Sequence, residues 1–173
     1  MHSSLILLIC ILVLTMSQAT NPKQIFFVCV SNTCRSPMAE YLFRRYLQQQ
    51  GIESEFTVAS RSLTTMYEPE NSPASYQGVE VMEKYYGVDM TGHRSKLLSA
   101  EDVQNAYAII PVKRGLRDDI IHYFPESKDK FIHFQEDIED PWHQPVSVFK
   151  SCAAMMEKQF PTIFNQLTNY RYK

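Results

Sequence analysis

A cysteine and an arginine that could handle a phosphate group lie close together near the start of the chain, at Cys29 and Arg35. They belong to residues 24–40, QIFFVCVSNTCRSPMAE, in which the apolar run 25–30 is typical of a strand buried on both faces. The amides of the following loop and the unpaired N–H groups of a helix after it are expected to converge on one point. Arg35 adds a planar fork that can hold two oxygens of a phosphate. The segment therefore predicts an anion site with a thiol beneath it.

Cys29 is the residue expected to react. A thiol that faces a helix N-terminus and a guanidinium readily becomes a thiolate, because both partners stabilise negative charge on sulfur. A thiolate is a good nucleophile and can form a covalent intermediate with a phosphoryl group. The rest of the loop would bind the phosphate oxygens or support the loop, namely Val30, Ser31, Asn32, Thr33, Cys34 and Ser36.

The stretch VCVSNTCRSPMAE resembles the phosphate-binding loop of the low-molecular-weight protein tyrosine phosphatase family, whose pattern is C-x5-R-S-P. The resemblance implies that Cys29 and Arg35 are catalytic and that Ser36 donates a hydrogen bond to the thiolate. The family usually has Gly where this chain has Ser31, at a sharp turn around the anion. A serine held there in a left-handed conformation is expected to cost about 1–2 kcal/mol, which would either loosen the loop or be tolerated.

The acidic segment 135–142, QEDIEDPW, carries the second functional signal. The family has its general acid at an Asp-Pro pair followed by an aromatic residue, and Asp140 with Pro141 and Trp142 matches that pattern. The resemblance implies that Asp140 protonates the leaving phenolate, and its acidic neighbours and the phosphate dianion are expected to keep it protonated until then. An acidic, solvated loop is the alternative.

Two further residues are implied by the resemblance. The segment GVDMTGHRSKLL is similar to a family segment in which a histidine buttresses the phosphate loop, so His93 is expected to bond to Asn32. Tyr67 lies in a loop over residues 60–73 and resembles the aromatic wall of the family's substrate cleft, with Trp142 opposite. A Tyr67 that merely packs its own loop is the alternative.

Strand-like and helix-like segments alternate along the chain, which predicts an α/β fold. We expect a three-layer α/β/α sandwich with a central parallel sheet of about four strands and the phosphate loop after the first strand. Ser36 is expected to cap the first helix, with Pro37 at its first position. Further helices are expected over 72–86, from Ser99 with a cap, over 116–124 and over 146–170, and further strands over 56–59, 106–112 and 131–134.

Cysteine usage argues against a disulfide-stapled domain. After residues 1–19, three cysteines remain, Cys29, Cys34 and Cys152, an odd number without a framework spacing. Cys34 is close enough to Cys29 to form a reversible disulfide that would shield the nucleophile from irreversible oxidation, and the family resemblance implies the same pairing. A Cys34 that only packs the loop is the alternative.

Residues 1–19 contain an apolar run over 5–14, followed by small residues at Ser17 and Ala19. The run is about half the length that spans a bilayer, so it predicts a cleaved secretory signal peptide, although no Lys or Arg precedes it. Residues 20–173 would then form one phosphatase domain, secreted or in the lumen of the secretory pathway and without stable membrane insertion. An uncleaved anchor is the alternative.

The charge composition of the chain limits the classes of molecule that it is expected to bind. The chain has 17 Lys and Arg, 19 Asp and Glu and a net charge of −2, with the basic residues scattered. This argues against a nucleic-acid surface or a polybasic membrane patch. We expect a monomer that acts on a phosphotyrosine-containing protein or a small aryl phosphate, with no cofactor and no metal, because the site supplies its own positive charge.

One stretch departs from the family pattern. The family usually has a Met-Asp or Met-Thr turn after the strand over 106–112, where this chain has Pro111, Val112, Lys113 and Arg114. The change adds positive charge at an edge of the sheet. If that charge faces the cleft, it would favour acidic phosphopeptides.

Three other functions compete. Arsenate reductases share the fold and loop, but they need a pair of resolving cysteines near residues 81–98, which contain none. Protein arginine phosphatases have a small hydroxyl residue just after the nucleophile, and Val30 has the branch without the hydroxyl. A catalytically impaired phosphoprotein-binding module is the third alternative, opposed by the presence of Cys29, Arg35 and Asp140 and supported by Ser31.

Overall fold

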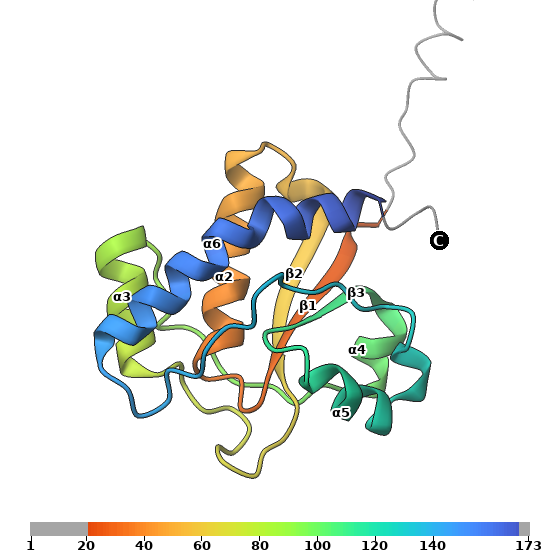
Figure 1. The fold of residues 1–173 in the computed structure, drawn as a ribbon, viewed down its shortest axis with the longest axis horizontal. Helices are drawn as coiled ribbons and strands as arrows, with labels where there is room; N and C mark the ends of the chain where they lie inside the picture. Colours follow the sequence, from red (N-terminus) through yellow and green to blue (C-terminus); the bar gives the residue numbers. More distant parts are fainter. Residues whose placement is uncertain (1–20, 170–173) are drawn as a thin grey trace, which may run out of the picture.

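The computed structural model describes residues 21–169, so the expected signal peptide over 1–19 lies outside the described residues. Its centre is a sheet of three parallel strands, β1 (Lys23–Cys29), β2 (Phe56–Ser62) and β3 (Ala106–Pro111), in the order β2-β1-β3 (Figure 1). Within residues 21–169, none of the helices is long and apolar enough to cross a membrane. The first strand thus lies in the middle of the sheet, hydrogen-bonded on both sides.

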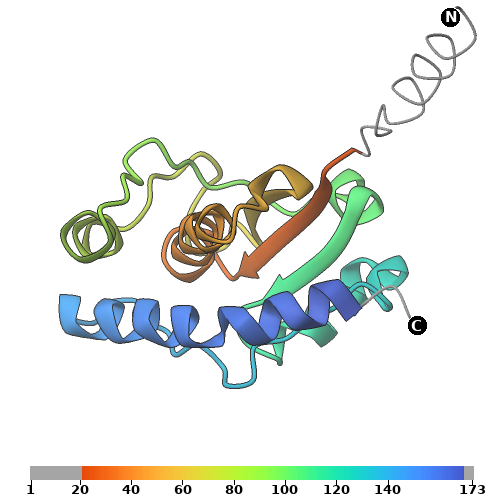
Figure 2. The same ribbon diagram turned by 90° about the horizontal axis from the view of Figure 1, so that it is seen from above.

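Helices cover both faces of this sheet and complete three layers (Figures 1 and 2). One face carries α2 (Arg35–Gln49), α3 (Tyr76–Tyr86) and α6 (Val146–Asn169), and the other carries α4 (Ala100–Asn105) and α5 (Leu116–Tyr123). Two 3-10 turns lie at Glu53–Glu55 and Pro125–Ser127. The expected α/β/α sandwich is confirmed.

The unbroken apolar run of β1 is explained by burial on both faces. Ile25 and Phe27 pack into the core on the α2 and α6 side, and Phe26 and Val28 pack into the core on the α4 and α5 side. Because side chains alternate along a strand, the next residue, Cys29, belongs to the α2 side. The strand therefore delivers the thiol to the start of α2.

The sheet has three strands among the described residues rather than about four. The expected last strand over 131–134 is reduced to a single bridge, Phe131 with Ile109. The N–H of Ile132 still donates to the carbonyl of Ile109 (3.1 Å), but the next bond of a parallel ladder would need an N–H at residue 111, and Pro111 has none. The ladder therefore stops after one bridge, and the backbone groups of His133, which face away from β3, bond to the side chain of Gln166 on α6.

Two helix starts also differ from expectation. The first turn of α2 begins at Arg35 rather than after a capping Ser36, and its N-cap, Cys34, makes no side-chain capping bond. Residues 72–75 are not helical, because Ser72 and Pro73 pair with the segment 94–95 instead. The expected cap of α4 is confirmed, since Ser99 and Asp102 form a reciprocal capping box.

Candidate active site

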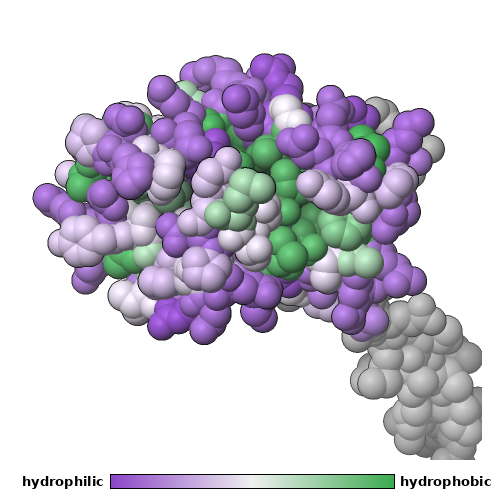
Figure 3. All heavy atoms as spheres, turned by 90° about the horizontal axis from the view of Figure 1, so that it is seen from below, coloured by the Kyte–Doolittle hydropathy of each residue, from purple (hydrophilic) through white to green (hydrophobic). Residues whose placement is uncertain are grey.

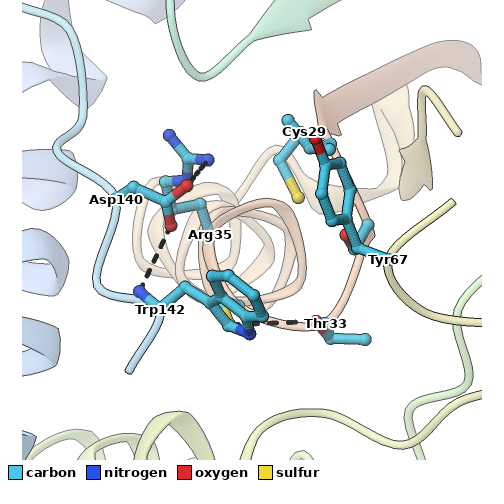
Figure 4. A pocket seen from close by; sticks show the side chains of 9 residues that line it. Cys29, Thr33, Arg35, Tyr67, Asp140 and Trp142 are labelled. Carbon is cyan, nitrogen blue, oxygen red and sulfur yellow. Dashed lines mark hydrogen bonds and ion pairs between the residues drawn. The ribbon is translucent and has the colours of Figure 1, made fainter. Parts of the chain in front are cut away.

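The carboxyl end of β1 opens into a hollow of about 280 Å³. It lies at the end of the fold shown in Figure 3, where apolar groups gather near the middle of the face. Figure 4 shows side chains from three separate segments arranged around this one space. The lining residues are Cys29, Val30, Ser31, Thr33, Cys34, Arg35, Tyr67, Asp140 and Trp142. The structure therefore brings together the three residues expected to be catalytic and both expected cleft walls.

Cys29 is buried at the start of the loop, and two donors point at its sulfur. The backbone N–H of Asn32 lies 3.2 Å from Sγ, and the hydroxyl of Ser36 lies 3.1 Å from it. The first turn of α2 contains no acidic residue, so nothing there opposes negative charge near its N-terminus. These contacts stabilise a thiolate and leave the sulfur at the floor of the hollow.

The sharp turn of the loop is made by Asn32 and not by Ser31. Asn32 has a φ of 58°, whereas Ser31 is not among the residues with positive φ. Asparagine enters the left-handed region more readily than most non-glycine residues. The expected strain at Ser31 is therefore wrong, and a residue suited to the conformation occupies the position that needs it.

The side chain of Asn32 is fully buried and makes three hydrogen bonds. Its Nδ2 donates to Ser36 Oγ (2.9 Å) and to Ser60 Oγ (2.8 Å), and its Oδ1 accepts from the backbone N–H of Lys96 (3.0 Å). Because Ser36 Oγ accepts from Asn32, its own proton is directed at Cys29 Sγ. One side chain thus fixes both the loop and the orientation of the hydroxyl beneath the thiol.

Sequence reasoning missed the outer part of this network. Ser60 at β2 donates to Oε2 of Glu40, a buried carboxylate that also pairs with Arg44 at 2.7 Å. Glu40 and Arg44 are four residues apart on α2, which is a spacing visible in the sequence. The link to Asn32 through Ser60 was not visible, because it depends on how β2 lies beside the loop.

His93 supports the loop as expected, through the backbone rather than the side chain of Asn32. Its Nε2 lies 2.8 Å from the carbonyl oxygen of Asn32, so Nε2 carries the donating proton. Burial lowers the pKa of His93 below its usual value, although the bond to Asn32 opposes that shift. A neutral imidazole with its proton on Nε2 is therefore the form that holds the loop.

Arg35 and Asp140 form an ion pair at the edge of the hollow. Arg35 NH2 lies 2.6 Å from Asp140 Oδ2, and NH1 donates to the carbonyl of Ile138 at 3.3 Å. The Nε of Arg35 is buried without a hydrogen-bond partner among the described residues. The expected crowding of acids around Asp140 is reduced, since Arg114 binds Asp137 through both its N–H and its Nε. The Asp140 carboxylate thus holds NH2 of Arg35 and the Ile138 carbonyl holds NH1, whereas Nε has no partner among the described residues.

Tyr67 and Trp142 form an aromatic rim. Their ring centroids are 6.3 Å apart at an angle of 62°, and both rings are about half exposed. Trp142 also lies against His143, whose φ of 58° bends the chain after the Asp-Pro pair. Rings at this separation and angle are in edge-to-face contact, so they form one aromatic edge of the hollow against which a flat aromatic group can pack.

The three described cysteines are all free thiols. Burial raises the pKa of Cys34, so this neighbour of the nucleophile stays protonated more readily than an ordinary thiol. Burial also raises the pKa of Cys152 to about 11, and its S–H donates to the carbonyl of Glu139 at 3.3 Å. Cys152 thereby contacts the segment that carries Asp140, a role that the sequence did not indicate.

Comparison with known proteins identifies the family. A family model described as low molecular weight phosphotyrosine protein phosphatase matches residues 24–172, and the chain belongs to that family. A protein-arginine-phosphatase from Geobacillus stearothermophilus is 34% identical over 143 residues, which cover 79% of this chain and 90% of that protein.

Two relatives named as phosphotyrosine protein phosphatase or protein tyrosine phosphatase are also similar. The low molecular weight phosphotyrosine protein phosphatase of Homo sapiens is 36% identical over 102 residues, 58% of this chain and 61% of that protein. The crystal structure of the low molecular weight protein tyrosine phosphatase from T. tengcongensis matches with a TM-score of 0.75 and 31% identity, covering 83% of this chain and 99% of that one.

Proposed function

We propose that the protein is a cysteine-dependent protein tyrosine phosphatase that hydrolyses phosphotyrosine and small aryl phosphates through a phosphocysteine intermediate. The observation that carries this proposal is the placement of Cys29 Sγ, with two hydrogen-bond donors on it, in one hollow with Arg35 and Asp140. Membership of the family and similarity to the phosphotyrosine protein phosphatase of Homo sapiens support the same reaction class.

In the first step, the Cys29 thiolate attacks phosphorus in line with the leaving oxygen. The sulfur–phosphorus bond forms as the bond from phosphorus to the tyrosyl oxygen breaks. Arg35 and the loop amides hold the three equatorial oxygens, where negative charge is spread in the transition state. Asp140 gives its proton to the departing phenolate, which leaves as tyrosine.

In the second step, water hydrolyses the phosphocysteine. Asp140, now a carboxylate, takes a proton from the water as its oxygen attacks phosphorus, and the sulfur–phosphorus bond breaks to release the thiolate. The Ser36 hydroxyl, 3.1 Å from Sγ, stabilises that thiolate as a leaving group. Phosphate then dissociates and the site is restored.

Substrate binding must first loosen the ion pair between Arg35 and Asp140. An Asp140 carboxylate held by a guanidinium has no proton to donate, and the phosphate dianion competes for the same guanidinium. When the phosphate takes Arg35, it brings negative charge to Asp140, which favours protonation of that carboxyl group. Binding and arming of the general acid are thereby coupled.

A protein arginine phosphatase is the second candidate, and the relative from Geobacillus stearothermophilus favours it. Against it, Val30 lines the hollow with an apolar branch and no hydroxyl, and the rim is formed by Tyr67 and Trp142, which suit an aryl group. Comparing turnover of matched phosphotyrosine and phosphoarginine peptides decides between them. An impaired binding module is disfavoured, because Asn32 and not Ser31 makes the turn and Ser31 was the residue that supported that alternative.

We further propose that residues 1–19 are a signal peptide, that residues 20–173 act as a secreted monomer, and that Cys34 can pair reversibly with Cys29. Amino-terminal sequencing of the exported protein tests the cleavage site. Recovery of activity by a thiol reductant after mild peroxide treatment, compared between the wild type and Cys34→Ser, tests the redox pair.

The assignment of Cys29 is tested by Cys29→Ser. This variant should lose turnover of p-nitrophenyl phosphate while it still binds inorganic phosphate, because the loop amides and Arg35 remain. Asp140→Ala should slow aryl phosphates with poor leaving groups most. A Cys29→Ser protein that keeps the wild-type rate would refute the mechanism.

A further inference from the structure

A second hollow, of about 350 Å³, lies directly beside the catalytic one. Three residues line both hollows, Val30, Arg35 and Asp140, so the two spaces adjoin along them. The second hollow continues past this boundary to Lys113, in the turn after β3, and to Leu116, the first residue of α5. A ligand whose phosphate occupies the catalytic hollow can therefore extend a neighbouring group toward Lys113.

Most of the charges at this hollow already have partners. Asp137 binds Arg114 at 3.2 Å, and Asp140 binds Arg35 at 2.6 Å. Lys113 is exposed and forms no ion pair with any residue in the range 21–169. Its ammonium group is thus available to a ligand.

Glu139 is the other charged residue of the hollow without an ion pair in the described part of the chain. Glu139 is close enough to Cys152 of α6 to contribute to the raised pKa of that thiol. Lys113, in contrast, follows β3 and precedes α5. The other lining residues include three apolar ones, Val30, Leu116 and Ile138. The hollow therefore offers a cation and apolar residues against which the stem of a side chain can lie.

We propose that this hollow is a substrate subsite in which Lys113 binds an acidic side chain adjacent to the phosphotyrosine. The proposal rests on the proposed phosphatase function and names the substrate class, which is acidic phosphotyrosine peptides. It also gives a function to the stretch 111–114, where the chain departs from the family pattern.

The test uses phosphotyrosine peptides with one Glu, Gln or Lys placed either before or after the phosphotyrosine. The ratio of kcat/KM for the Glu and Gln peptides is measured for the wild type, Lys113→Met and Lys113→Glu. Lys128→Glu is the matched control, because Lys128 is also an exposed lysine but does not line the hollow. Turnover of p-nitrophenyl phosphate is measured in parallel, since this substrate is too small to reach Lys113.

The wild type should prefer the Glu peptide over the Gln peptide by about twofold to fivefold at low salt, as expected for one exposed ion pair. Lys113→Met should abolish the preference, Lys113→Glu should reverse it toward the Lys peptide, and Lys128→Glu should leave it unchanged. Turnover of p-nitrophenyl phosphate should be the same in all variants.

Equal ratios in the wild type and both Lys113 variants would overturn the proposal. An equal change in Lys128→Glu would also overturn it, because the effect would then come from overall charge. A wild-type preference for the Lys peptide that Glu139→Gln removes would assign the hollow to a basic side chain instead. If the wild type did not turn over p-nitrophenyl phosphate at all, the proposed phosphatase function would fail. The peptide ratios test the subsite alone, so the two failures can be told apart.

Discussion

Replacement of Asn32 by Ala is expected to cost more than any other single change in the phosphate loop. The substitution removes three buried hydrogen bonds, to Ser36, Ser60 and the N–H of Lys96. At about 0.5–1.5 kcal/mol each, these bonds contribute roughly 2–4 kcal/mol to the free energy of unfolding. Ala at a φ of 58° adds about 1–2 kcal/mol of backbone strain. We therefore expect a loss of about 3–6 kcal/mol.

A second left-handed asparagine separates the two contributions. Asn71 has a φ of 69°, and it is exposed with no side-chain hydrogen bond among the described residues. Asn71→Ala should therefore show the strain alone, about 1–2 kcal/mol. Asn32→Gly should show the lost bonds without the strain, because Gly accepts this conformation freely.

Urea unfolding of the three variants gives these free energies, and turnover of p-nitrophenyl phosphate gives the functional effect. Asn32→Ala should also lose most of its activity, since Ser36 would no longer be oriented toward Cys29. An Asn32→Ala protein that unfolds within 1 kcal/mol of Asn71→Ala, or keeps wild-type kcat, would refute the assignment of loop support to Asn32.

The remaining predictions concern other parts of the site. Ser31→Gly should leave the free energy of unfolding unchanged or slightly lower, because Ser31 does not need a positive φ; a gain of 1 kcal/mol in urea unfolding would contradict this. Asp140→Asn should lower the inhibition constant of inorganic phosphate about fivefold while it lowers kcat, because loss of a half-exposed ion pair worth about 1 kcal/mol frees Arg35; weaker phosphate binding would count against the coupling. The buried His93 has a lowered pKa, so just below its ordinary value of 6.5 the unfolded chain binds more protons than the folded one and stability falls as the pH falls through that window. His93→Gln, whose amide can still donate to the Asn32 carbonyl, should show a flatter pH dependence in urea unfolding, and an unchanged slope would exclude His93 as its source.

The first strand and the catalytic residues were predictable from the sequence because their signals are local. The apolar run of β1, the loop from Cys29 to Arg35 and the Asp-Pro pair at Asp140 each occupy a few adjacent residues. The fold then places them in one hollow with Tyr67 and Trp142, as expected. Parallel strands bring their carboxyl ends to one edge, so this meeting follows from the α/β pattern.

The features that sequence reasoning missed depend on partners far along the chain. The fourth strand is reduced to one bridge because Pro111 of β3 has no N–H to donate to the carbonyl of Ile132. The left-handed turn falls on Asn32 because Ser60 and the N–H of Lys96 meet its side chain there. The higher left-handed propensity of asparagine was a local signal that favoured Asn32 over Ser31 at this turn. Local motifs thus gave the chemistry, and long-range contacts decided the backbone geometry that supports it.

The central claim is that Cys29 forms a covalent bond to phosphorus. Rapid acid quenching of the wild type during turnover of a phosphotyrosine peptide, followed by mass spectrometry of the peptide that contains Cys29, measures this directly. We predict a single phosphoryl group on Cys29 that appears before steady state and is absent from Cys29→Ser. Steady turnover with no phosphoryl group on Cys29, or a phosphoryl group on another residue, would contradict the account.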